Sequence, residues 1–84
     1  MTASSKIKEL VRPHRPIKNI HERKKLVISN IGRLKRYMLS IKFYETSFSE
    51  RKKFRNAYLD QCKILNVIDA KIYMQKELSF PFGG

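Results

Sequence analysis

Acidic residues and cysteine are scarce in this chain of 84 residues, and each scarcity excludes something. Only 7 Asp and Glu stand against 19 Lys and Arg, so the formal net charge is +12 and polyanionic partners such as nucleic acid are favoured. Cys62 is the only cysteine, so no intrachain disulfide can form and nothing indicates an oxidising compartment. We therefore expect a cytoplasmic setting or an equivalent one.

Long apolar runs are also absent. No stretch reaches the roughly 20 apolar residues that a membrane-spanning helix needs, and residues 1–19 hold no apolar run that could act as a signal segment. A chain of 84 residues allows one domain, and its core is marginal for a protein that folds alone. We therefore expect stability to come in part from self-association or from a partner.

Among the residues that are present, the apolar ones follow a helical spacing and predict an all-α protein. A first long helix is expected over about 19–44, because Asn19 and Glu22 have the spacing of a capping box. The apolar residues that follow step by four and three positions, which predicts a seam facing a neighbouring helix. This predicted seam consists of Val27, Ile31, Leu34, Met38 and Ile41.

A second long helix is expected over about 48–78. It follows a break at 45–47, where Ser47 and Glu50 repeat the capping-box spacing. So short a connection favours an antiparallel helical hairpin, which would occupy residues 19–79. The main apolar stripe of the second helix has a mean spacing of about 3.6 residues. This stripe consists of Phe54, Tyr58, Cys62, Leu65, Ile68 and Ile72.

Further apolar residues lie on the opposite face of the second helix, and two helices cannot cover them. We expect this face to bind a second copy in a four-helix bundle or another protein. The C-terminal tail, residues 80–84, could instead fold back over it. The predicted partner-binding residues are Val67, Met74, Leu78, Phe80 and Phe82.

Residues 1–18 are expected to form a basic flexible arm. Pro13 and Pro16 favour an extended backbone, and the segment 6–11 is expected to form one helical turn at most. The arm is either a solvated tail or a segment that becomes ordered along a nucleic-acid groove.

No residue pattern indicates catalysis. His14 and His21 lie in or beside the arm, and the chain has no glycine-rich phosphate loop and no recognisable set of Ser, His and acid. No metal-ligand spacing relates the histidines to Cys62. We therefore expect no enzyme activity, no metal and no cofactor.

Basic clusters carry the remaining chemistry. The tetrapeptide Glu-Arg-Lys-Lys occurs at 22–25 and again at 50–53, each time at an expected helix start. Three cations there oppose the helix dipole, so folding gives them no role, whereas contact with phosphate would. In a hairpin the two copies would lie roughly 35 to 40 Å apart, which is about one turn of duplex. The predicted nucleic-acid-binding residues are Arg23, Lys24, Lys25, Arg33, Lys35, Arg36, Arg51, Lys52, Lys53 and Arg55.

Our main hypothesis is a small protein without catalytic activity that contacts the phosphate backbone of DNA or RNA. Tyr37 and Tyr44 flank the basic surface and are candidates for stacking on bases. The alternative is a helical adaptor or small subunit that binds a larger protein or ribonucleoprotein through its surplus apolar faces. Association with a membrane surface is a third hypothesis, less favoured because the chain has no Trp.

Overall fold

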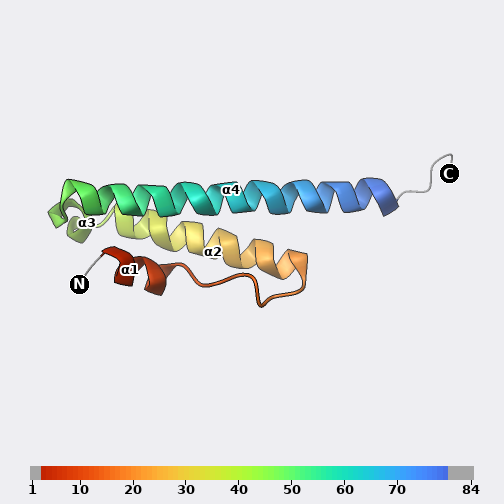
Figure 1. Ribbon diagram of the computed structural model, residues 1–84, viewed down its shortest axis with the longest axis horizontal. Coiled ribbons are helices and arrows are strands. Elements are labelled where there is room, and N and C mark those ends of the chain that lie inside the picture. Colours follow the sequence, from red (N-terminus) through yellow and green to blue (C-terminus); the bar gives the residue numbers. More distant parts are fainter. Residues whose placement is uncertain (1–2, 80–84) are drawn as a thin grey trace.

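The computed structural model describes the backbone of residues 3–79 and the side chains of residues 3–76 (Figure 1). Within these residues the regular structure consists of helices without any strand, so the predicted all-α class is confirmed. None of the helices in this range is long and apolar enough to cross a membrane. The elements are α1 (Ala3–Leu10), α2 (Ile20–Met38), α3 (Ile41–Glu45) and α4 (Phe48–Ser79).

The molecule is elongated, with extents of 59 × 20 × 16 Å. α2 and α4 lie side by side and run in opposite directions, and the short α3 joins them at one end (Figure 1). α1 packs near that same end, against both α2 and α4. α4 continues well past the start of α2, so its C-terminal part has no neighbouring helix in the described part of the chain (Figure 1).

Capping residues define where α2 and α4 begin. Asn19 Oδ1 accepts hydrogen bonds from the backbone N–H groups of His21 at 2.9 Å and Glu22 at 3.2 Å, which confirms the predicted cap. In a capping box the Glu22 carboxylate would accept a hydrogen bond from the Asn19 backbone N–H. Here the carboxylate lies 3.7 Å from Lys25 Nζ instead. At the start of α4, the Glu50 N–H donates to Ser47 Oγ at 3.4 Å.

The single helix expected over 19–44 is two helices, because the chain leaves the helical path at Leu39 and Ser40. The Ser40 hydroxyl and backbone N–H both donate to the Tyr37 carbonyl, which offers the backbone an alternative to continuing the helix. The break turns Phe43 into the core, where it is 4% exposed. It also leaves Ile41 77% exposed, so the prediction that Ile41 belongs to the seam is wrong.

Most of the segment 6–11 lies in the eight-residue helix α1, so the expectation of one helical turn at most is wrong. Ala3, Ile7 and Leu10 recur at helical spacing and pack against a core that includes Leu34 and Phe54. A helix this short is unstable alone in water, so this tertiary contact is what stabilises it. α1 and the segment that follows it lie along α2 (Figure 1). The described part of the expected arm, residues 3–18, is therefore docked on the helix pair.

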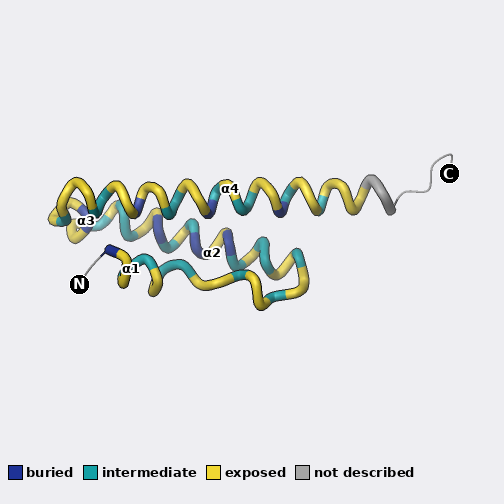
Figure 2. The backbone as a smooth tube through the Cα atoms, in the orientation of Figure 1, coloured by how far each residue is buried: buried dark blue, intermediate teal, exposed yellow. Residues whose placement is uncertain are grey.

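Buried residues line the facing sides of α2 and α4 (Figure 2). On α4 the seam steps by four and three, as in coiled coils, and passes through Gln61, which is 7% exposed. The predicted stripe passed through Cys62 at this point, but Cys62 is half-buried and lies beside the seam. On α2 the seam passes through the fully buried Asn30, while the predicted Ile31 is half-buried.

Asn30 uses all the hydrogen-bonding capacity of its buried amide. Its oxygen accepts from the Arg12 backbone N–H at 3.0 Å and from the Arg33 guanidinium. Its nitrogen donates to the Arg12 carbonyl at 2.9 Å and to Gln61 Oε1 at 3.2 Å. Two donors and two acceptors are the whole inventory of an amide side chain, so the cost of burying it is offset. Asn30 thus ties the N-terminal segment, α2 and α4 together.

We predict that Asn30→Ala lowers the free energy of unfolding by about 2 to 3 kcal/mol, because the Gln61 amide and the Arg12 backbone lose their partners in a buried site. Urea denaturation followed by circular dichroism measures this loss. Hydrogen exchange at the Arg12 amide should also become faster in the variant.

The matched control is Asn66→Ala, which removes an exposed amide from α4. It should change the free energy of unfolding by no more than about 0.5 kcal/mol. Equal effects of the two substitutions would contradict the structural role of Asn30.

Candidate nucleic-acid interface

The first Glu-Arg-Lys-Lys copy, at 22–25, is engaged in holding the fold together. Arg23 donates from Nε to the Ile17 carbonyl and from Nη2 to the Arg15 carbonyl at 3.4 Å. These bonds fix the end of the N-terminal segment beside the start of α2. Folding therefore gives Arg23 a role that the sequence alone did not indicate.

The two lysines of this copy lie in ion pairs. Lys24 Nζ is 2.8 Å from Asp69 Oδ1, a contact that joins the start of α2 to the C-terminal half of α4. Lys25 Nζ is 3.7 Å from Glu22 Oε1 on the surface of α2. The inference that folding leaves these cations without a role is therefore wrong for the first copy. Contact between these cations and phosphate stays a prediction.

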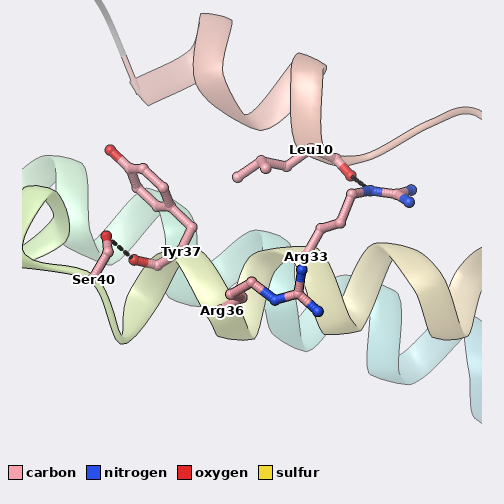
Figure 3. Close-up of a pocket in the computed structure, with 5 residues that line it drawn as sticks. All are labelled: Leu10, Arg33, Arg36, Tyr37 and Ser40. Atoms are coloured by element: carbon pink, nitrogen blue, oxygen red, sulfur yellow. Dashed lines mark hydrogen bonds between the residues drawn. The ribbon is translucent and has the colours of Figure 1, made fainter.

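Arg33 also serves the fold, as Figure 3 shows. Its Nε donates to the Leu10 carbonyl at 2.7 Å and so satisfies an acceptor at the C-terminus of α1. Burial, together with the nearby charge of Arg12, lowers the pKa of the Arg33 guanidinium from its usual value. Arg33 and Arg36 both line a cavity of about 310 Å³ beside the end of α1 (Figure 3), where Arg36 is exposed to solvent.

The second Glu-Arg-Lys-Lys copy, at 50–53, is arranged differently at the start of α4. Lys52 and Lys53 are exposed and form no ion pair with any residue that the structure describes. Arg51 is half-buried, and its Nε is buried without a hydrogen-bond partner among the described residues. An unsatisfied donor of this kind costs about 1 to 3 kcal/mol. Folding does not account for these three cations.

α2 stops and α4 starts at the same end of the molecule (Figure 1), and the helical segments there carry further cations. They come from the last turn of α2, from α3 and from the first two turns of α4. Over the corresponding span, 35–58, the only acids are Glu45 and Glu50. We call this region the basic end. It comprises Lys35, Arg36, Lys42, Arg51, Lys52, Lys53 and Arg55.

A cavity of about 260 Å³ opens at the basic end, between α2, α3 and α4. Cations, aromatic rings and aliphatic side chains line this basic-end cavity, and no described acid does. It therefore combines positive charge with apolar surface. The lining residues are Lys35, Met38, Leu39, Phe43, Tyr44, Arg51, Arg55 and Tyr58.

The two tyrosines proposed as stacking residues have different surroundings. The Tyr37 ring lies 4.8 Å from the Phe54 ring, between centroids, and Lys6 Nζ lies 5.3 Å from the Tyr37 centroid. Tyr37 is therefore engaged in the core and with α1. Tyr44 is 66% exposed and is held by an edge-to-face contact with Phe43, at 5.9 Å between centroids and an interplanar angle of 74°. Of the two rings, Tyr44 is the accessible one.

A second cationic cavity, of about 230 Å³, lies toward the other end of the molecule, between the N-terminal segment and α4. Desolvation lowers the pKa of His14 there, and the charges of Arg23 and Arg15 lower it further. Its lining residues are His14, Arg23, Lys63, Ile64, Val67, Ile68 and Lys71.

The predicted partner-binding residues are only partly described. Val67 and Met74 are 54% and 62% exposed on α4, so they are accessible to a partner. Leu78 belongs to α4, but its side chain lies outside the described part, and Phe80 and Phe82 lie outside the described residues.

Sequence reasoning missed the basic-end cavity, because it placed Lys35 on one long straight helix. The break at Leu39 and Ser40 carries α3 across the end of the molecule and brings Tyr44 beside the start of α4. Ser40 and the short apolar segment after it were the available signal for a helix break. Propensity alone does not identify a break inside so apolar a pattern.

Comparisons with models of protein families, with curated proteins and with solved structures find no match for this chain. Among the described residues, no group of three or more His, Cys, Asp and Glu side chains could hold a metal ion. The interpretation of the site therefore depends on the geometry and charge given above.

The lowered pKa of His14 predicts a pH-dependent stability. The folded state binds the imidazole proton less readily than the unfolded state, whose pKa is near 6.5. Stability that is present above this value should fall as the pH drops through it toward the folded-state pKa. Urea denaturation at about pH 7.5 and about pH 5.5 should show that His14→Gln loses less stability on acidification than the natural protein.

His21→Gln is the matched control, because His21 is exposed at the start of α2. This control should keep the pH dependence of the natural protein. An unchanged pH dependence in His14→Gln would contradict the assignment.

Proposed function

We propose that this chain is a small, non-enzymatic nucleic-acid-binding protein whose basic end contacts the phosphate backbone of DNA or RNA. The observation that carries the proposal is the gathering of cations from three helices at one end of the molecule. All of them except Arg51 are exposed, and none forms an ion pair with a described residue.

This arrangement opposes the stability of the folded chain. Arg51 and Arg55 are one helical turn apart, where like charges repel. Arg51 also lies in the first turn of α4, near the positive end of the helix dipole. A polyanion relieves this repulsion and releases its own counterions when it binds. Phosphate binding therefore gives the basic end a function that folding does not.

The structure changes the relative weight of the two Glu-Arg-Lys-Lys copies in this proposal. The first copy has partners within the chain, so contacts with phosphate there compete with existing hydrogen bonds and ion pairs. The second copy lies in the basic end and is the main contributor. Contacts with phosphates carry no sequence information, so recognition of backbone or shape is expected rather than of base edges.

The test removes charge from the basic end by the combined change Lys52→Gln, Lys53→Gln and Arg55→Gln. Binding of a fluorescently labelled duplex should weaken. The slope of log K against log salt should fall in magnitude by about 2 to 3, at about 0.9 per lost contact. Fluorescence anisotropy at a series of salt concentrations measures both quantities.

The control removes the same charge elsewhere, by Lys8→Gln, Lys18→Gln and Lys71→Gln, at exposed positions outside the basic end. It should alter the salt dependence much less. Equal effects of the two variants, or binding that does not depend on salt, would remove the basis of the proposal.

A second candidate function is favoured by the apolar side chains that α4 leaves exposed. Val67, Tyr73 and Met74 are 54%, 64% and 62% exposed. Beyond Asp69, which pairs with the start of α2, the helix continues for about 15 Å. In this candidate, α2 and α4 form a helical hairpin that completes a bundle with a second copy or acts as an adaptor on a larger protein.

The combined change Val67→Ser and Met74→Ser tests this second candidate. If copies of the chain complete a bundle, the natural protein should sediment as an oligomer and the variant as a monomer. Leu59→Ser, which alters an equally exposed position nearer the basic end, is the control. A natural protein that is monomeric and unchanged by the substitutions contradicts self-association through this face.

A further inference from the structure

We infer that the basic-end cavity holds one unstacked base of a single-stranded nucleic acid, with the neighbouring phosphates on the surrounding cations. This inference rests on the proposed function and adds to it the form of nucleic acid that is bound. It depends on three observations: the charge around the cavity, the aromatic ring at its mouth and its size.

The charge comes from two helices that converge on the cavity. Lys35 approaches from the last turn of α2, and Arg51 and Arg55 approach from successive turns of α4. The Arg51 side chain is half-buried against the cavity, while Lys35 and Arg55 are exposed to solvent there. A phosphate beside the cavity would therefore meet positive charge on two sides.

The aromatic surface comes from α3. Phe43, at 4% exposure, is fixed in the core by its edge-to-face contact with Phe54, at 5.9 Å between centroids. Phe43 in turn holds the ring of Tyr44, which remains 66% exposed where it lines the cavity. An anchored but accessible ring is suited to stacking on a planar base.

The size of the cavity selects among forms of nucleic acid. At about 260 Å³ it is slightly smaller than the pockets that hold drug-sized ligands, which begin near 300 Å³. It therefore suits one planar group rather than a longer segment. Bases in a duplex are already stacked and paired, whereas a single strand can turn a base out toward an aromatic side chain. The combination favours a single strand.

The test compares three fluorescently labelled ligands of the same length at one salt concentration: a mixed-sequence single strand, the corresponding abasic strand and the duplex. The natural protein should bind the single strand at least about fivefold more tightly than the abasic strand, because only the former can stack on Tyr44. Tyr44→Ala should remove this difference. The affinity for duplex should not change in that variant.

Tyr73→Ala is the matched control, since Tyr73 is similarly exposed, at 64%, on α4 but does not line the cavity. This control should keep the preference for the base-bearing strand. Circular dichroism should show that both variants retain the helical content of the natural protein.

The outcomes separate this inference from the proposed function. Equal affinities for the base-bearing and abasic strands, or a preference that survives in Tyr44→Ala, would overturn the inference and leave phosphate binding intact. Failure to bind any of the three ligands at low salt would contradict the proposed function itself.

Discussion

The buried amide of Asn30 is the constraint on which the rest of this fold depends. It pairs with Gln61 across the seam between α2 and α4, and a polar pair at such a position fixes the register of two helices at some cost in stability. The same amide holds both backbone groups of Arg12, so one side chain sets the register and docks the N-terminal segment. Arg33 extends this network by donating to the Leu10 carbonyl at the end of α1. This bond holds α1 against the core residues Leu34 and Phe54.

Only some of the cations of this highly charged chain take part in holding the N-terminal segment in place. Arg23 and Arg33 direct their guanidinium donors to backbone carbonyls of the N-terminal segment, which a planar group with several donors does well. The docked segment then closes one side of the helix pair. The cations of the basic end take no part in this docking and remain available to a ligand. Some cations of this chain thus stabilise the docked segment, whereas those of the basic end are the ones that we propose bind phosphate.

The local parts of this structure could be predicted from the sequence, whereas the parts that depend on tertiary contacts could not. Asn19 caps α2 as expected because a cap needs only the residues that follow it. The break before α3 was missed because it depends on the burial of Phe43. The seam was drawn through apolar residues, so the buried Asn30 and Gln61 were missed. A polar residue at a seam position was the signal, and its partners could be identified only in three dimensions.

The central claim is that nucleic acid binds at the basic end while the cations at the start of α2 serve the fold. Amide NMR spectra of the isotope-labelled protein, recorded during titration with a short oligonucleotide, test it most directly. The account predicts that the signals of α3 and of the first turns of α4 shift, and that those of residues 22–25 stay close to their original positions. Shifts concentrated at 22–25, or spread along the C-terminal half of α4, would contradict it.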